Sequence, residues 1–183
     1  MTREISSGGV VLRELAGVWH VALIEPQKED SRDAKTSRKR SRAVLCIPKG
    51  LVDAGERPEA AAVREVLEET GVTAAVVTKL IDLKYVYVRS WGDGERVFKI
   101  VSFYLMRYVR GEIGEISPDM RIEVKRALWV PLADATKQMA YSGERKVVLE
   151  AQRYLASNGL SSRVEEGKNS ARRKLAPKKA RLK

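Results

Sequence analysis

The sequence has very little sulfur and imidazole. Among its 183 residues there is one cysteine, Cys46, and one histidine, His20. A single cysteine excludes a disulfide within the chain and indicates a reducing compartment, which we expect to be the cytoplasm. With one residue of each kind, the chain also has few means of building a nucleophilic triad. We interpret Cys46 as a small core residue and His20 as a structural residue of a strand.

Long apolar runs are also absent. No stretch of 18 consecutive apolar residues occurs, which argues against a helix that crosses a membrane. A chain of this length is expected to fold as one domain with a substantial core, and we place that domain at residues 1–160.

Two segments account for the net charge of +11. Residues 28–42 carry seven Lys or Arg and three Asp or Glu, and residues 161–183 carry nine and two. Neither segment shows the period of a helix or strand, so we predict a basic inserted loop at residues 27–42 and a disordered tail at residues 161–183. The charge of the tail predicts weak, nonspecific contact with nucleic acid. A solvated tail that aids solubility is the alternative.

The pattern of apolar and turn residues predicts a mixed α/β domain. Residues 91–94 read WGDG, a strong turn signal, and should join two long strands into a hairpin. Helices are expected from Pro58 to the residue before Gly71, and at residues 132–139 and 143–157. Strands are expected at residues 4–15, 18–25, 43–47, 72–88, 96–109 and 127–130.

The most informative stretch is residues 50–72, which read GLVDAGERPEAAAVREVLEETGV. Glu65, Glu68 and Glu69 stand at i, i+3 and i+4, so they share one face of the expected helix. Like charges so placed repel by about 0.2–0.5 kcal/mol per pair on an exposed helix. A hard divalent cation turns that repulsion into binding, because Mg²⁺ selects carboxylate oxygens. We expect Glu69 to face solvent.

The same stretch fits the pattern G-x5-E-x7-R-E-U-x-E-E-x-G-U, in which U is a bulky aliphatic residue. On these residues the chain resembles the Nudix hydrolases. All nine fixed positions match, namely Gly50, Glu56, Arg64, Glu65, Val66, Glu68, Glu69, Gly71 and Val72.

The resemblance implies a fold and an activity. The fold would be an α/β/α sandwich with a mixed β-sheet. The activity would be hydrolysis of a nucleoside diphosphate linked to another group, with Mg²⁺ or Mn²⁺ as cofactor. A non-catalytic module that kept the fold and senses a ligand is the alternative from a different class.

The resemblance also implies roles for single residues. Glu65, Glu68 and Glu69 would bind the metal, or one of them would help to deprotonate water, and a backbone carbonyl of Lys49 or Gly50 would complete the metal shell. Arg64 would hold a carboxylate, and we expect an ion pair between Arg64 and Glu56 that orients loop and helix. Gly71 would end the helix. A further acid is usual in the family; Asp119 and Glu123 are candidates, and we prefer Glu123.

Substrate choice depends on residues outside the pattern. Lys49, Tyr85, Tyr87 and the strand that contains Tyr104 resemble the branch that cleaves diadenosine tetraphosphate and related nucleoside polyphosphates. Aromatic rings could stack on adenine and lysine could neutralise phosphate, although the tyrosines could equally pack on the domain. Oxidised nucleoside triphosphates, ADP-ribose and diphosphoinositol polyphosphates are the other open substrates.

Overall fold

The computed structural model describes residues 2–27, 44–89 and 94–160. The expected tail, the expected inserted loop apart from Gln27, and the expected turn apart from Gly94 lie outside these residues. The elements are β1 (Thr2–Leu15), β2 (Val18–Pro26), β3 (Lys49–Leu51), α1 (Pro58–Thr70), β4 (Val72–Val88), β5 (Arg96–Gly111), a 3-10 turn (Pro118–Ile122), β6 (Val124–Pro131), α2 (Leu132–Gln138) and α3 (Ser142–Asn158). None of the helices in the described ranges is long and apolar enough to cross a membrane.

The strands form one mixed sheet in the order β4-β5-β1-β2-β6, and β3 pairs with β1 outside this path. β1 and β5 run parallel, with Gly8 opposite Phe103, whereas every other pair is antiparallel. β1 is longer than β2 and β3, which both pair with it along the edge that faces away from β5. Its later residues therefore pair with β2, and its earlier residues pair with β3. This division brings the residues before α1 onto the centre of the sheet.

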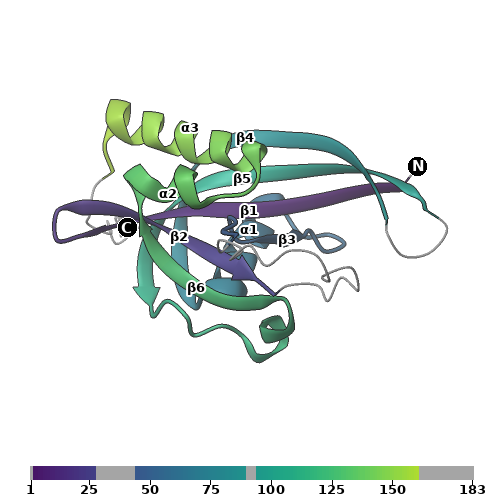
Figure 1. The fold of residues 1–183 in the computed structure, drawn as a ribbon, viewed down its shortest axis with the longest axis horizontal. Helices are drawn as coiled ribbons and strands as arrows, with labels where there is room; N and C mark the ends of the chain where they lie inside the picture. The colour runs from purple at the N-terminus through teal and green to yellow at the C-terminus, as the bar shows by residue number, and fades with distance from the viewer. Residues whose placement is uncertain (1, 28–43, 90–93, 161–183) are drawn as a thin grey trace, which may run out of the picture.

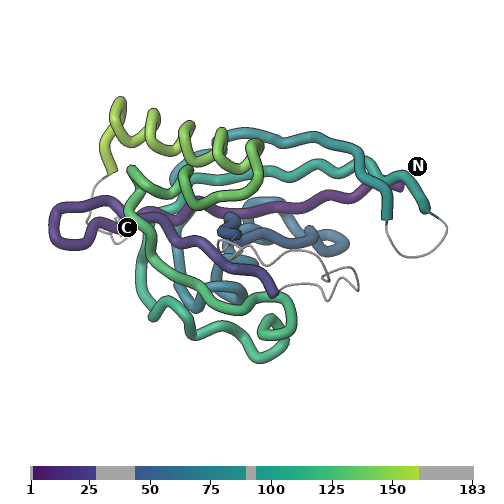
Figure 2. The backbone as a smooth tube through the Cα atoms, in the orientation of Figure 1, coloured from purple at the N-terminus to yellow at the C-terminus, as the bar shows by residue number. Residues whose placement is uncertain are grey.

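Helices cover both faces of the sheet, as the resemblance implied. Figure 1 shows α2 and α3 on one side and α1 on the other. Phe103, Val147 and Val148 belong to the core on the α3 side, and Val66 and Tyr104 belong to the core on the α1 side. Successive residues of a strand point to opposite faces, so Phe103 and Tyr104 serve different layers. Figure 2 shows that the β4–β5 hairpin and the start of β1 reach beyond the helices.

One expected strand is wrong. Of the expected strand at residues 43–47, the described residues 44–47 form no strand; Leu45 and Cys46 make only isolated bridges, to Met139 and Ile24. Leu45, Cys46 and Ile47 are all buried, so the segment lacks the alternation of a half-exposed strand. The regular strand is instead β3, in residues that we expected to form a loop, because β1 supplies its pairing partner.

Helix α1 ends as expected at Gly71. The φ angle of Gly71 is 80°, and its N–H donates to the Leu67 carbonyl oxygen at 2.8 Å. A Cβ added to Gly71 would lie 2.6 Å from the Glu112 carbonyl oxygen and 2.7 Å from that of Glu115. Both the backbone angle and the space therefore require glycine at this position.

We predict that Gly71→Ala destabilises the protein more than Gly55→Ala does. Gly55 has a similar φ of 82° but nothing within 4 Å of an added Cβ, so it isolates the cost of the backbone angle. That angle costs a side chain about 1–2 kcal/mol, and a forced contact in a packed site adds about 1–3 kcal/mol. Urea unfolding of both variants measures the difference. Equal losses of unfolding free energy would show that the carbonyls around Gly71 move aside at no cost.

Candidate active site

The three glutamates of α1 share one face, but their surroundings differ. Glu65 and Glu69 are buried, with exposed fractions of 6% and 5%, and Glu68 is partly exposed. The expectation that Glu69 faces solvent is wrong. The strand β3 and the residues before it cover Glu69, and the Lys49 N–H donates to Glu69 Oε2 at 2.8 Å.

Burial changes the acidity of these side chains. It raises the pKa of Glu69 to about 8, although the Lys49 N–H and the Lys49 charge act in the opposite direction. Burial also raises the pKa of Glu65 in spite of its contact with Arg64. A desolvated carboxylate disfavours its charged form unless a positive charge lies close to it. This pair of buried carboxylates is therefore suited to bind a cation.

Arg64 connects the helix to the loop that precedes it. Its Nε and Nη2 donate to the two carboxylate oxygens of Glu56 at 3.0 and 2.9 Å. Nη2 also donates to the Leu51 carbonyl oxygen at 2.9 Å. The expected ion pair between Arg64 and Glu56 is therefore present, in the bidentate form that fixes both groups. The Arg64 hydrogen bonds are also the main reason that the pKa of Glu56 is lowered.

Arg64 also contacts two of the α1 glutamates. Its Nη1 donates to Glu65 Oε1 at 2.7 Å and to Glu68 Oε2 at 3.1 Å. Within the described ranges, no three carboxylate, imidazole or thiol groups converge closely enough to form a ready metal site. Arg64 pairs with two of the three expected ligands. The donor set of three carboxylates nevertheless suits a hard divalent cation.

Gly50 makes close contact with Glu65. A Cβ added to Gly50 would lie 2.1 Å from Glu65 Oε1 and 2.3 Å from Oε2. The carboxylate thus occupies the space that a side chain at residue 50 would need. The absence of a side chain at this position allows Glu65 to lie directly against the backbone of β3.

Glu123 is exposed and follows the 3-10 turn before β6. It makes no direct contact with the α1 glutamates, but its charge is a minor cause, after burial, of the raised pKa of Glu65 and of Glu69. Its carbonyl oxygen accepts the Gln27 N–H at 2.7 Å, which fixes its backbone to the end of β2. The 3-10 turn before Glu123 is joined to the end of α1, since the Ser117 N–H donates to the Glu68 carbonyl oxygen at 2.9 Å.

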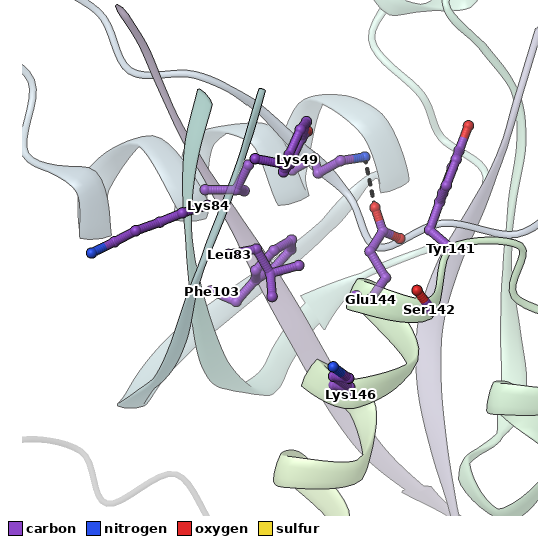
Figure 3. A pocket seen from close by; sticks show the side chains of 11 residues that line it. Lys49, Leu83, Lys84, Phe103, Tyr141, Ser142, Glu144 and Lys146 are labelled. Carbon is purple, nitrogen blue, oxygen red and sulfur yellow. Dashed lines mark ion pairs between the residues drawn. The ribbon is translucent and has the colours of Figure 1, made fainter. Parts of the chain in front are cut away.

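A cavity of about 710 Å³ lies beside the cluster, between the β4–β5 strands and the start of α3. Its base is apolar, and Lys49 and Tyr85 are among the residues that line it. Figure 3 shows Lys49 and Glu144 pointing toward each other, whereas the amino group of Lys84 is directed away from them. The lining residues are Lys49, Leu83, Lys84, Tyr85, Val101, Phe103, Tyr141, Ser142, Gly143, Glu144 and Lys146.

The other two tyrosines lie elsewhere. Tyr104 is 5% exposed and packs in the core on the α1 side, so it does not line the cavity. The Tyr87 hydroxyl donates to Glu4 Oε2 at 2.9 Å, and its ring lies 6.4 Å from that of Tyr85 without lining the cavity. Strand alternation explains Tyr104, because its neighbour Phe103 points to the opposite face.

Sequence reasoning missed Glu144. It is 4% exposed, and its Oε1 lies 3.1 Å from the Lys49 amino group. Burial alone would lower the pKa of Lys49, but the Glu144 charge outweighs that effect and raises it. One signal was available, because Glu144 stands at the spacing of the apolar residues Val147, Val148 and Ala151 and so lies on the buried face of its helix.

Comparison with known proteins identifies the family. The model of the NUDIX domain matches residues 17–151 of this chain. The chain belongs to the Nudix family. Nudix hydrolases generally use divalent metal ions, which agrees with the chemistry of the α1 donor set.

Relatives that are more than 30% identical to this chain include two mycobacterial proteins. The "Putative mutator protein MutT4" of Mycobacterium tuberculosis is 34% identical over 150 residues, which are 79% of this chain and 52% of that protein. The "8-oxo-(d)GTP phosphatase" of Mycolicibacterium smegmatis is 32% identical over 102 residues, which are 56% of this chain and 28% of that protein. This chain thus spans about half of the first relative and less of the second.

Solved Nudix structures share the fold. An Ap4A hydrolase of C. elegans, in a binary complex, has a TM-score of 0.61 at 23% identity and covers 84% of this chain and 98% of its own. The NUDIX domain of Shewanella oneidensis NrtR, complexed with ADP ribose, has a TM-score of 0.63 at 15% identity and covers 85% and 90%. At sequence identities of 23% and 15%, the similarity to these two structures shows the fold alone.

The contact between Gly50 and Glu65 can be tested by stability alone. We expect Gly50→Ala to lower the free energy of unfolding by about 1–3 kcal/mol, because the new methyl group overlaps a buried carboxylate. The same substitution in a Glu65→Ala background should cost far less, since the overlapping atoms are gone. Urea unfolding of the wild type, both single variants and the double variant measures the coupling. A Gly50→Ala cost that is the same in both backgrounds would contradict the contact.

Proposed function

We propose that this Nudix protein is a metal-dependent hydrolase that cleaves a phosphoanhydride bond of a nucleoside diphosphate-linked substrate. The observation that carries the proposal is the burial of Glu65 and Glu69 against the Lys49–Gly50 backbone, next to a cavity lined by Lys49. Carboxylates held there bind a cation, and a lysine beside them attracts phosphate.

Each residue has a chemical task in this proposal. Glu65, Glu68 and Glu69, with the backbone carbonyl of Lys49 or Gly50, would hold Mg²⁺ or Mn²⁺. The bound ion would neutralise charge on the phosphates and would lower the pKa of a water molecule bound to it. Arg64, through Glu56 and the Leu51 carbonyl, keeps the loop against α1.

The bond cleavage itself needs a nucleophile and a proton acceptor. Water attacks phosphorus, the bridging P–O bond breaks, and the departing phosphate takes the bonding electrons. A carboxylate accepts the proton of that water, and we assign this task to Glu123 or to one of the three α1 glutamates that does not then bind the ion. Most of the rate enhancement then comes from positioning and electrostatics.

We further propose nucleoside polyphosphates, with dinucleoside polyphosphates first, as the substrate class. The support is that Lys49 and Tyr85 both line the cavity and that Tyr85 is 44% exposed. In this proposal Lys49 would meet phosphate and the Tyr85 ring would stack on a base. Tyr141 lines the same cavity and adds a second exposed ring, which the sequence did not single out. Tyr87 and Tyr104 no longer support this assignment.

Oxidised nucleoside triphosphates are the second candidate. The support for them is the printed name of a relative that is 32% identical to this chain, an 8-oxo-(d)GTP phosphatase. The relative covers only 56% of this chain, and its name describes a whole protein much longer than the matched part. Diphosphoinositol polyphosphates and a purely ligand-sensing role have less support from the described residues, since the first has no base to stack on the tyrosines and the second leaves the buried glutamates without a task. ADP-ribose carries both an adenine and a diphosphate, but it offers one base to a cavity lined by two exposed tyrosine rings.

The first functional prediction concerns Glu69. Glu69→Gln should lower turnover by ~10²-fold or more, the scale lost when a main electrostatic element is removed. The substitution is nearly isosteric, and the amide oxygen can still accept the Lys49 N–H, so the protein should stay folded. Phosphate release from diadenosine tetraphosphate with Mg²⁺ measures turnover, and thermal unfolding checks the fold.

Glu59→Gln is the matched control for that experiment. Glu59 lies in the first turn of the same helix, is exposed, and pairs with Arg57. We expect turnover within about twofold of the wild type, in keeping with the small effects of exposed ion pairs. A folded Glu69→Gln protein with wild-type turnover would falsify the assignment of the site.

The second functional prediction concerns substrate choice. Diadenosine tetraphosphate should be cleaved with a higher kcat/KM than ADP-ribose or 8-oxo-dGTP, since this ratio measures discrimination. Tyr85→Ala should raise KM for diadenosine tetraphosphate by about tenfold, because the stacking of a base on an aromatic ring contributes about 1–3 kcal/mol. Tyr85→Phe keeps the ring and should leave KM near the wild-type value.

The competing outcomes distinguish the candidates. A kcat/KM that is highest for 8-oxo-dGTP would favour the oxidised nucleotides. An unchanged KM in Tyr85→Ala would show that this ring only packs on the domain.

A further inference from the structure

Glu144 is a buried carboxylate with two separate partners. It lies in the first turn of α3 and is 4% exposed. Its Oε2 accepts the Ile47 N–H at 2.8 Å, and its Oε1 pairs with the Lys49 amino group at 3.1 Å. One side chain of α3 therefore binds both the backbone and a side chain of residues 47–50, which we call the 47–50 segment.

Helix α1 contacts the same segment through its own carboxylates. The Lys49 N–H donates to Glu69 Oε2 at 2.8 Å, and the Glu65 carboxylate fills the space beside Gly50. The 47–50 segment is thus held by α3 through Glu144 and by α1 through Glu65 and Glu69. Figure 3 shows Glu144 reaching from α3 toward Lys49.

We propose that Glu144 is a positioning residue for the cation site. It keeps the 47–50 segment in place, so that the backbone of Lys49 and Gly50 stays against Glu65 and Glu69. Glu144 itself does not contact the cation or the substrate. This inference rests on the proposed function, because it assigns Glu144 a task toward the metal that the proposed hydrolase uses.

A simpler explanation is attraction through space. As a negative charge near the cluster, Glu144 would favour a cation without holding anything in place. Lys49 separates the two explanations, because its charge has the opposite sign. If only charge mattered, Lys49→Met would tighten cation binding. If the Glu144–Lys49 pair holds the segment, removing either partner loosens the segment and weakens binding.

The experiment measures Mn²⁺ binding to the full chain without substrate, from the electron paramagnetic resonance signal of free Mn²⁺. We expect Glu144→Ala and Lys49→Met each to weaken Mn²⁺ binding by ~10-fold or more, the scale for groups that orient metal ligands. Glu144→Gln should weaken Mn²⁺ binding less than Glu144→Ala does, because its amide oxygen can still accept the Ile47 N–H. Thermal unfolding of each variant shows whether it is folded at the assay temperature. If the Glu144→Ala protein is unfolded at that temperature, Mn²⁺ binding by the Glu144→Gln and Lys49→Met variants tests the positioning role.

Glu150→Ala is the matched control. Glu150 lies on the same helix, is partly exposed and pairs with Arg153, so its removal changes the net charge equally without touching the 47–50 segment. We expect Mn²⁺ binding within about twofold of the wild type. Tighter binding in Lys49→Met, or unchanged binding in both Lys49→Met and the Glu144 variants, would overturn the positioning role. A wild-type protein that binds no Mn²⁺ would overturn the metal-dependent function and this inference together.

Discussion

The constraint on which the site depends is the burial of two glutamates of α1 against the 47–50 segment. Taking a carboxylate out of water disfavours its charged form, which is why burial raises the pKa of Glu69 to about 8. The Lys49 N–H and Arg64 recover part of that energy, and a bound cation would recover more. The carboxyl groups are thus held in position before a ligand arrives, and a bound cation would favour the charged form of Glu69 that burial disfavours.

Arg64 has two roles that oppose each other. Through Glu56 and the Leu51 carbonyl it fixes the loop to the helix, and through Glu65 and Glu68 it neutralises two expected metal ligands. A guanidinium has enough donors to do both at once. When a cation binds, its charge would compete with that of Arg64 for the same oxygens, while the contacts with Glu56 could persist.

The architecture explains why the cavity and the carboxylates are neighbours. β1 pairs with β3 along its first half. β3 and the residues just before it therefore lie between α1 on one face of the sheet and α3 on the other. This segment presents its backbone to α1, and it presents the Lys49 side chain to α3 and the cavity. Two distant parts of the sequence, residues 49 and 144, meet because β3 lies between α1 and α3 and contacts both helices.

Much of this protein follows from local sequence. The spacing of Glu65, Glu68 and Glu69, the helix end at Gly71 and the Arg64–Glu56 pair depend on helix geometry and short-range chemistry, which residues fix by themselves. Tertiary structure decided what depends on distant partners. It buried Glu69, made β3 a strand, turned Tyr104 away from the cavity and paired Glu144 with Lys49. Burial and strand pairing are set by segments far apart in the chain, so no local pattern could specify them.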